Sequence, residues 1–131
     1  MKRLYILLII FIFLFEHINA QEIEVSTEHF VFTAERYHNK CIVMEMRFRE
    51  FASIQNKSGF TKCTMEGIVD SLLQNGEQIL FYNVYLDSDT IEKWAKKLVF
   101  GKRIIVHAYV GEANRNWTQL NVYKIEEVSS P

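Results

Sequence analysis

Residues 78–110, QILFYNVYLDSDTIEKWAKKLVFGKRIIVHAYV, predict a strand, a helix and a second strand in that order. Gln78–Leu86 is rich in aromatic and aliphatic residues and predicts a strand that is apolar on both faces. Lys102–Val110 alternates, which predicts a half-buried strand whose inward side chains are Ile104, Val106, Ala108 and Val110.

The stretch between these strands has helical spacing. Asp87-Ser-Asp-Thr90 begins the helix, with Asp89 and Glu92 in a capping arrangement. One apolar face is expected to pack on the protein, since apolar residues recur at helical intervals. These residues are Ile91, Trp94, Ala95, Leu98 and Val99. Gly101 is expected to end the helix.

Three further strands are predicted around this unit. Cys41–Phe51 alternates with period 2, a second strand runs through residues 62–69, and the last strand is Trp117–Val128. Gly67 inside the second strand indicates a bulge or a sharp bend. Turn chemistry occurs at residues 53–59, at Gln74–Glu77 and at Gly111–Asn116. Residues 21–40 stay open between a short helix capped by Ser26 and a strand.

The predicted order is three strands, one helix and two strands, which is the order of the oligonucleotide/oligosaccharide-binding (OB) barrel. The predicted fold class is therefore mainly β with one helix: a small OB-like five-stranded antiparallel barrel over residues 41–128, with the helix between strands three and four. In that barrel the helix closes one end.

Several segments resemble one family more narrowly. Gly67-Ile68-Val69-Asp70, Trp94, the strand that begins at Gly101 and the strand that begins at Trp117 resemble the bacterial OB-fold (BOF) family of small exported proteins. The resemblance covers about residues 62–128, and a looser one exists to anticodon-binding-like OB domains. In the family the glycine-bearing strand comes first, whereas here Cys41–Phe51 precedes it. The resemblance implies binding without catalysis and assigns no site residue.

The amino terminus has the pattern of a signal peptide. Lys2 and Arg3 precede an apolar run from Leu4 to Phe15, and Ala20 is the expected cleavage point. The run is shorter than the about 20 residues that span a bilayer, although an uncleaved anchor remains the alternative. We therefore expect residues 1–20 to be removed, a periplasmic or secreted location, and no membrane insertion after cleavage.

The charge balance bears on the partner. The chain has 15 basic and 16 acidic residues, a net charge of −1, and cleavage would bring it to about −2. Because nucleic-acid binders normally carry a basic stripe that neutralises phosphates, this balance disfavours nucleic acid as a partner.

The two cysteines, Cys41 and Cys63, form a candidate disulfide, since an oxidising compartment would permit it. The alternative is two buried thiols, because a hairpin that turns near residues 56–59 would place residue 41 opposite a residue near 73.

No motif of catalysis or metal binding occurs in the chain. His29, His38 and His107 lack metal-ligand spacing, and no G-x-S-x-G is present. Glu126 and Glu127 point to opposite faces of a strand and cannot act on one substrate together. We expect no enzyme, no cofactor and no metal.

Aromatic and basic side chains supply the candidate ligand site. Phe81, Asn83 and Tyr85 are predicted to share one face of their strand, and Arg47 and Arg49 one face of the first strand. Trp117 lies near a loop as an anchor or a barrel lid. In OB barrels such residues on strands two and three stack and steer ligands, although they can equally complete a small core.

Two functions remain open from the sequence. The first is an exported, non-enzymatic OB-type domain that binds a small ligand, a glycan or a protein. The alternative is a periplasmic inhibitor or immunity protein that acts by protein–protein contact.

Overall fold

The computed structural model describes residues 21–52, 59–69, 79–113 and 117–129. The amino-terminal elements are β1 (Glu22–Glu24), α2 (Thr27–Phe32) and a 3-10 helix, η1 (Ala34–Tyr37). The barrel elements are β2 (Cys41–Phe51), β3 (Thr61–Gly67), β4 (Leu80–Leu86), α3 (Ser88–Trp94), β5 (Arg103–Ala113) and β6 (Thr118–Glu127).

Strands β2 to β6 close into a barrel. The hydrogen-bonded order is β1-β2-β3-β4-β6-β5, and β2 also pairs with β5, which closes the ring. The β4–β6 pair is parallel, and the other pairs within the ring are antiparallel. This strand order, with a helix after the third strand of the ring, confirms the predicted OB-like fold class.

The barrel interior is filled by side chains at alternate positions of each strand. Ile42, Met44, Met46 and Phe48 of β2 are each at most 3% exposed. Burying an aliphatic or aromatic side chain of this size stabilises the fold by about 1.5–3 kcal/mol. The alternation predicted for Cys41–Phe51 is therefore confirmed, and it supplies one wall of the core.

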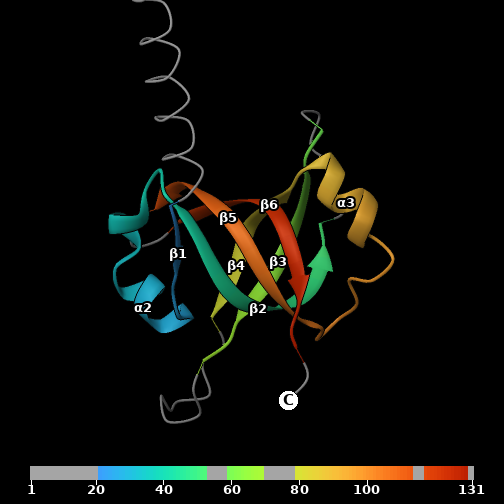
Figure 1. Ribbon diagram of the computed structural model, residues 1–131, viewed down its shortest axis with the longest axis horizontal. Coiled ribbons are helices and arrows are strands. Elements are labelled where there is room, and N and C mark those ends of the chain that lie inside the picture. The colour runs from blue at the N-terminus through green and yellow to red at the C-terminus, as the bar shows by residue number, and fades with distance from the viewer. Residues whose placement is uncertain (1–20, 53–58, 70–78, 114–116, 130–131) are drawn as a thin grey trace, which may run out of the picture.

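Helical segments cover the two ends of the barrel (Figure 1). At one end α3 places Trp94 in the core, and the chain that follows it buries Leu98. At the other end α2 and η1 bury Phe30, Ala34 and Tyr37. The amino-terminal segment thus contains both the strand and the helix between which the sequence left a choice, and Ser26 Oγ caps α2 by accepting from His29 N–H.

The helix after β4 differs from its prediction. It ends at Trp94 rather than near Gly101, so Val99 is 58% exposed instead of buried. Its cap is Asp87, whose carboxylate accepts from the Thr90 N–H at 2.8 Å, and not Asp89 with Glu92. The β-branched Val99 and the following Phe100-Gly101 pair are weak helix formers, which explains the early end.

The predicted disulfide does not form. Cys41 and Cys63 are both free, and Cys63 is fully buried, which raises its pKa to about 12. Cys63 pairs with Phe51, ten positions along β2 from Cys41. At roughly 3.3 Å per residue the two cysteines lie near opposite ends of that strand, far beyond disulfide reach. The predicted turn at Gln74–Glu77 lies outside the described residues.

Gly67 has a packing role that differs from the predicted bulge. It pairs in register with Met46, and the register shifts lie elsewhere, between Phe48 and Glu50 and between Cys63 and Met65. A side chain at position 67 would collide with the methyl group of Thr27, which is itself 2% exposed. Glycine is therefore required so that the first turn of α2 can seat on β3.

We predict that Gly67→Ala lowers the free energy of unfolding by about 2 kcal/mol, the range found for overpacked cores. Chemical denaturation monitored by circular dichroism measures the loss. The double variant Gly67→Ala/Thr27→Ala should recover most of it, because it removes the methyl group that the new Cβ meets. A double variant no more stable than Gly67→Ala would contradict this account.

Candidate functional site

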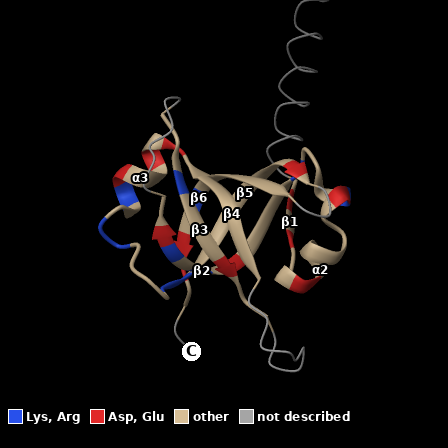
Figure 2. Cartoon of the chain, turned by 180° about the vertical axis from the view of Figure 1, so that it is seen from behind, with Lys and Arg blue, Asp and Glu red and all other residues tan. Residues whose placement is uncertain are grey.

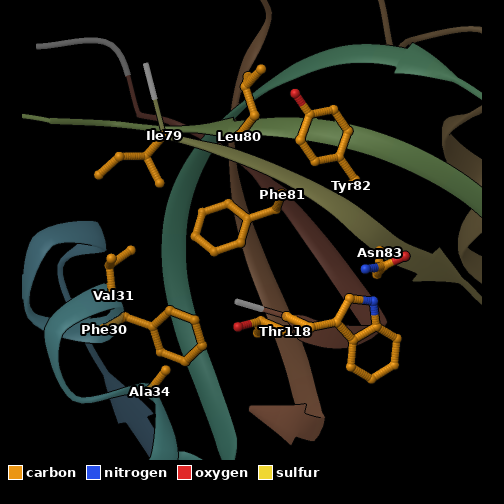
Figure 3. A pocket seen from close by; sticks show the side chains of 10 residues that line it. Phe30, Val31, Ala34, Ile79, Leu80, Phe81, Tyr82, Asn83 and Thr118 are labelled. Atoms are coloured by element: carbon orange, nitrogen blue, oxygen red, sulfur yellow. The ribbon is translucent and has the colours of Figure 1, made fainter. Parts of the chain in front are cut away.

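A hollow of about 230 Å³ lies between α2, the start of β4 and the start of β6 (Figure 3). Aromatic and aliphatic side chains make most of its wall, and two polar side chains complete it. The described residues that line it are Phe30, Val31, Ala34, Ile79, Leu80, Phe81, Tyr82, Asn83, Trp117 and Thr118.

The floor of the hollow is formed by two rings from different elements. Phe30 of α2 and Phe81 of β4 are buried, and their ring centroids are 6.0 Å apart. Phe30 also packs on Tyr37, with centroids 5.7 Å apart. Offset, tilted ring pairs of this kind are favourable, so the floor is a fixed part of the core.

The rim is more exposed than the floor. Tyr82 is 60% exposed and Trp117 is 38% exposed, while Asn83 and Thr118 are half-buried. The described lining residues carry no charged side chain. Such a surface offers ring faces, a side-chain amide and hydroxyl groups, which suit an uncharged ligand.

A bulge in β4 determines which side chains reach this hollow. Val84 pairs with Cys63 and Phe81 with Met65, so three steps along β4 match two along β3. The extra residue reverses the alternation, which turns Phe81 inward together with Val84. The predicted common face of Phe81, Asn83 and Tyr85 is therefore broken.

The predicted site residues fall into two groups. Phe81, Asn83 and Trp117 meet at the hollow. Tyr85 does not line it and lies opposite Lys62 of β3 and Asn121 of β6.

Arg47 and Arg49 also lie away from the hollow, on β2. As predicted they are neighbours, but both face Glu66 of β3, with Nη1 to carboxylate distances of 4.0 Å and 3.3 Å.

Residues of the amino-terminal segment were missed as candidates. Thr27, Phe30 and Ala34 recur at helical spacing and are the buried side of α2 and η1. That spacing was the available signal, and it was weakened by the β-branched and aromatic residues between them.

A second cluster surrounds His107, whose ring was predicted to be at or near the surface but is 7% exposed. Its Nδ1 lies 2.9 Å from Glu22 of β1, and its Nε2 lies 3.0 Å from Glu126 of β6. Both hydrogen bonds form together only when each ring nitrogen carries a proton, because ionised carboxylates only accept. The imidazolium form thus joins β1 to the barrel wall.

The neighbours of His107 tune the carboxylates. Tyr123 donates its hydroxyl to Glu22 at 2.7 Å, and Lys124 lies 3.2 Å from Glu126. Burial raises the pKa of Glu22, but the hydrogen bonds from Tyr123 and His107 outweigh it and leave that pKa below its usual value. Hydrogen bonds from His107 and Lys124 also lower the pKa of Glu126.

Within the described ranges, no three His, Cys, Asp or Glu residues lie close enough to hold a metal ion. The His107 cluster is therefore a tie between strands in this structure. In the same part of the chain, no helix has the length and apolar character needed to cross a membrane.

We predict that the stability of the protein falls as the pH drops from about 5 to about 3. A carboxyl whose folded pKa is lowered contributes stability above its unfolded pKa, and this is lost as the pH falls through the folded value. Glu22→Gln should lower the free energy of unfolding at neutral pH by about 1 kcal/mol, discounted for its partial exposure.

The same substitution should reduce the acid-induced loss. Urea unfolding at several pH values measures both effects. Glu24→Gln, at an exposed position of the same strand, is the matched control. An equal response of the two variants would show that the His107 tie has no such role.

Comparisons with known proteins agree on the fold only at a coarse level. No family model matches the chain, and no curated protein is similar to it in sequence. The narrower resemblance to the exported bacterial OB-fold family is therefore without support from a family model.

A solved structure is similar in its arrangement: a chain from the structure titled "Structure and Conformational Change of a Replication Protein A Heterotrimer Bound to ssDNA". The TM-score is 0.42 with 10% identity, over 69% of this chain and 58% of that chain. The match thus covers less than two thirds of the neighbour's length.

The comparison corrects one prediction. Net charge disfavoured nucleic acid as a partner, yet a similar chain belongs to a protein bound to ssDNA, so that prediction was wrong. The net charge is an average over the whole surface and does not describe local charge. The strand pairing itself shows that the chain is an OB-like barrel, a fold used typically for binding.

Proposed function

We propose that this protein is a non-catalytic binding domain that holds one ring of a neutral glycan in the hollow beside Trp117. The observation that carries the proposal is the composition of the described wall, which combines aromatic rings with an amide and hydroxyl groups and has no charged side chain. Sugar rings present apolar C–H faces and hydroxyl edges, which match such a wall.

The size of the hollow supports one ring rather than a larger ligand. Its 230 Å³ lies below the roughly 300–1,000 Å³ of pockets that enclose drug-sized molecules. The exposed Tyr82 and Trp117 at the rim leave room for an oligosaccharide to continue over the surface. OB barrels include oligosaccharide binders, so the fold is compatible with this class.

The place of action is also a proposal. The Lys2-Arg3 start, the apolar run to Phe15 and Ala20 support export to the periplasm or the exterior. Extracellular glycans are available there as ligands.

We predict that neutral oligosaccharides change the fluorescence of Trp117. The chain has two tryptophans, and Trp94 is buried under α3, so Trp94→Phe leaves Trp117 as the single reporter. A panel of soluble neutral oligosaccharides is titrated against this variant. A saturable change in intensity is expected for at least one of them.

The site is then tested by substitution. Trp117→Ala and Asn83→Ala should each weaken binding about tenfold or more, measured by calorimetry, since central aromatic anchors dominate such sites. Phe60→Ala is the matched control, because Phe60 is 39% exposed, as Trp117 is 38% exposed, and does not line the hollow. Binding that survives Trp117→Ala, or a panel without a single binder, would refute the proposal.

A further inference from the structure

The segment between α3 and β5 holds an aromatic side chain out in water. Residues 99–102 form a tight turn in which Lys102 N–H donates to the Val99 carbonyl at 3.1 Å. Gly101 has φ +84°, as the third residue of a type II turn requires. Phe100 occupies the second position and is 71% exposed, and Val99 beside it is 58% exposed.

This turn is firmly attached to the barrel. Gly101 N–H donates to the Phe48 carbonyl at 2.7 Å, and Phe48 N–H donates to the Lys102 carbonyl at 2.9 Å. Leu98, just before the turn, is 5% exposed. The exposure of Phe100 therefore results from a fixed backbone, and a rigid exposed apolar tip has no role in folding.

The surroundings of the tip are strongly basic. Residues 93–103 include five basic residues and no acidic one. Lys93, Lys96 and Lys97 are exposed, and none of them forms an ion pair with the described residues. Figure 2 shows this basic stretch beside α3 and along the chain that follows it.

Two further cations lie near the tip. The Arg49 guanidinium lies 4.7 Å from the centroid of the Phe100 ring. Lys102 Nζ lies 3.5 Å from Glu127, in an exposed ion pair that contributes little to stability.

We propose that this turn docks on an anionic lipid bilayer. Val99 and Phe100 enter the interface between headgroups and acyl chains, and Lys93, Lys96 and Lys97 contact the headgroup phosphates. Apolar tips ringed by lysines bind such surfaces because burial and charge attraction add together. This inference is independent of the hollow beside Trp117.

The chemistry of the tip favours a bilayer over a polynucleotide. Bases need an open ring face for stacking, and Arg49 lies over the Phe100 ring. Val99 has no ring at all, whereas a bilayer interface accepts both side chains. Lysines, which act as point charges, suit a fluid array of headgroups.

The test uses the chain from Gln21 onward, which contains every described strand and helix and the whole buried core. Its folding is checked by circular dichroism. Co-sedimentation is measured with vesicles of phosphatidylcholine alone and of phosphatidylcholine mixed with phosphatidylglycerol. We expect binding to the mixed vesicles only, and a decrease as salt is added.

Two variants test the residues. Phe100→Ser and the double variant Lys96→Glu/Lys97→Glu should each lower the partition coefficient on mixed vesicles about tenfold. Phe32→Ser is the matched control, because Phe32 is 83% exposed on α2, at the other end of the barrel. Arg36→Glu/Lys40→Glu is the control for charge reversal.

Three results would overturn the proposal: no binding to mixed vesicles, equal binding to both vesicle types, or an equal loss with Phe32→Ser. A single-stranded oligothymidine is measured in parallel by fluorescence anisotropy. If it binds, vesicles do not, and Phe100→Ser abolishes that binding, the turn serves a polynucleotide and the bilayer proposal is wrong.

Discussion

Barrel closure depends on strand β2, which is hydrogen-bonded along both of its edges. Residues 41–47 pair with β5 on one edge, and residues 46–51 pair with β3 on the other. β1 occupies the part of that second edge which β3 does not reach, pairing with residues 41–43. An open edge at this position would be a template for pairing with another chain, so β1 protects the barrel as well as extending it.

The amino-terminal segment therefore has three connected tasks. It covers the free edge of β2, it closes one end of the barrel with Phe30, and it supplies part of the wall of the hollow. Glu22 holds it in place from the outside, through His107. Loosening the contact between Thr27 and Gly67 would disturb the hollow as well as the fold, since α2 forms both.

The sequence predicted the fold because strand alternation and strand order are local signals. Cys41–Phe51 alternates over its whole length, and its bounds were predicted correctly. The predicted site was only partly right, since Phe81, Asn83 and Trp117 meet at the hollow but Tyr85, Arg47 and Arg49 lie elsewhere. The β4 bulge explains the first error: one extra residue reverses the alternation, and nothing in the letters FYNVY marks it.

The other errors arose where tertiary contacts override local preference. The pairing of Phe48 with Gly101 and Lys102 draws residues 99–102 into the barrel wall and turns Val99 outward, although its helical spacing fits an apolar face. Net charge failed for a related reason, because opposite charges are separated in space. The described wall of the hollow is uncharged, whereas residues 93–103 carry five basic side chains and no acidic one. A chain with a net charge of −1 can thus present a neutral surface at one end of its barrel and a cationic surface at the other, and each suits a different kind of partner.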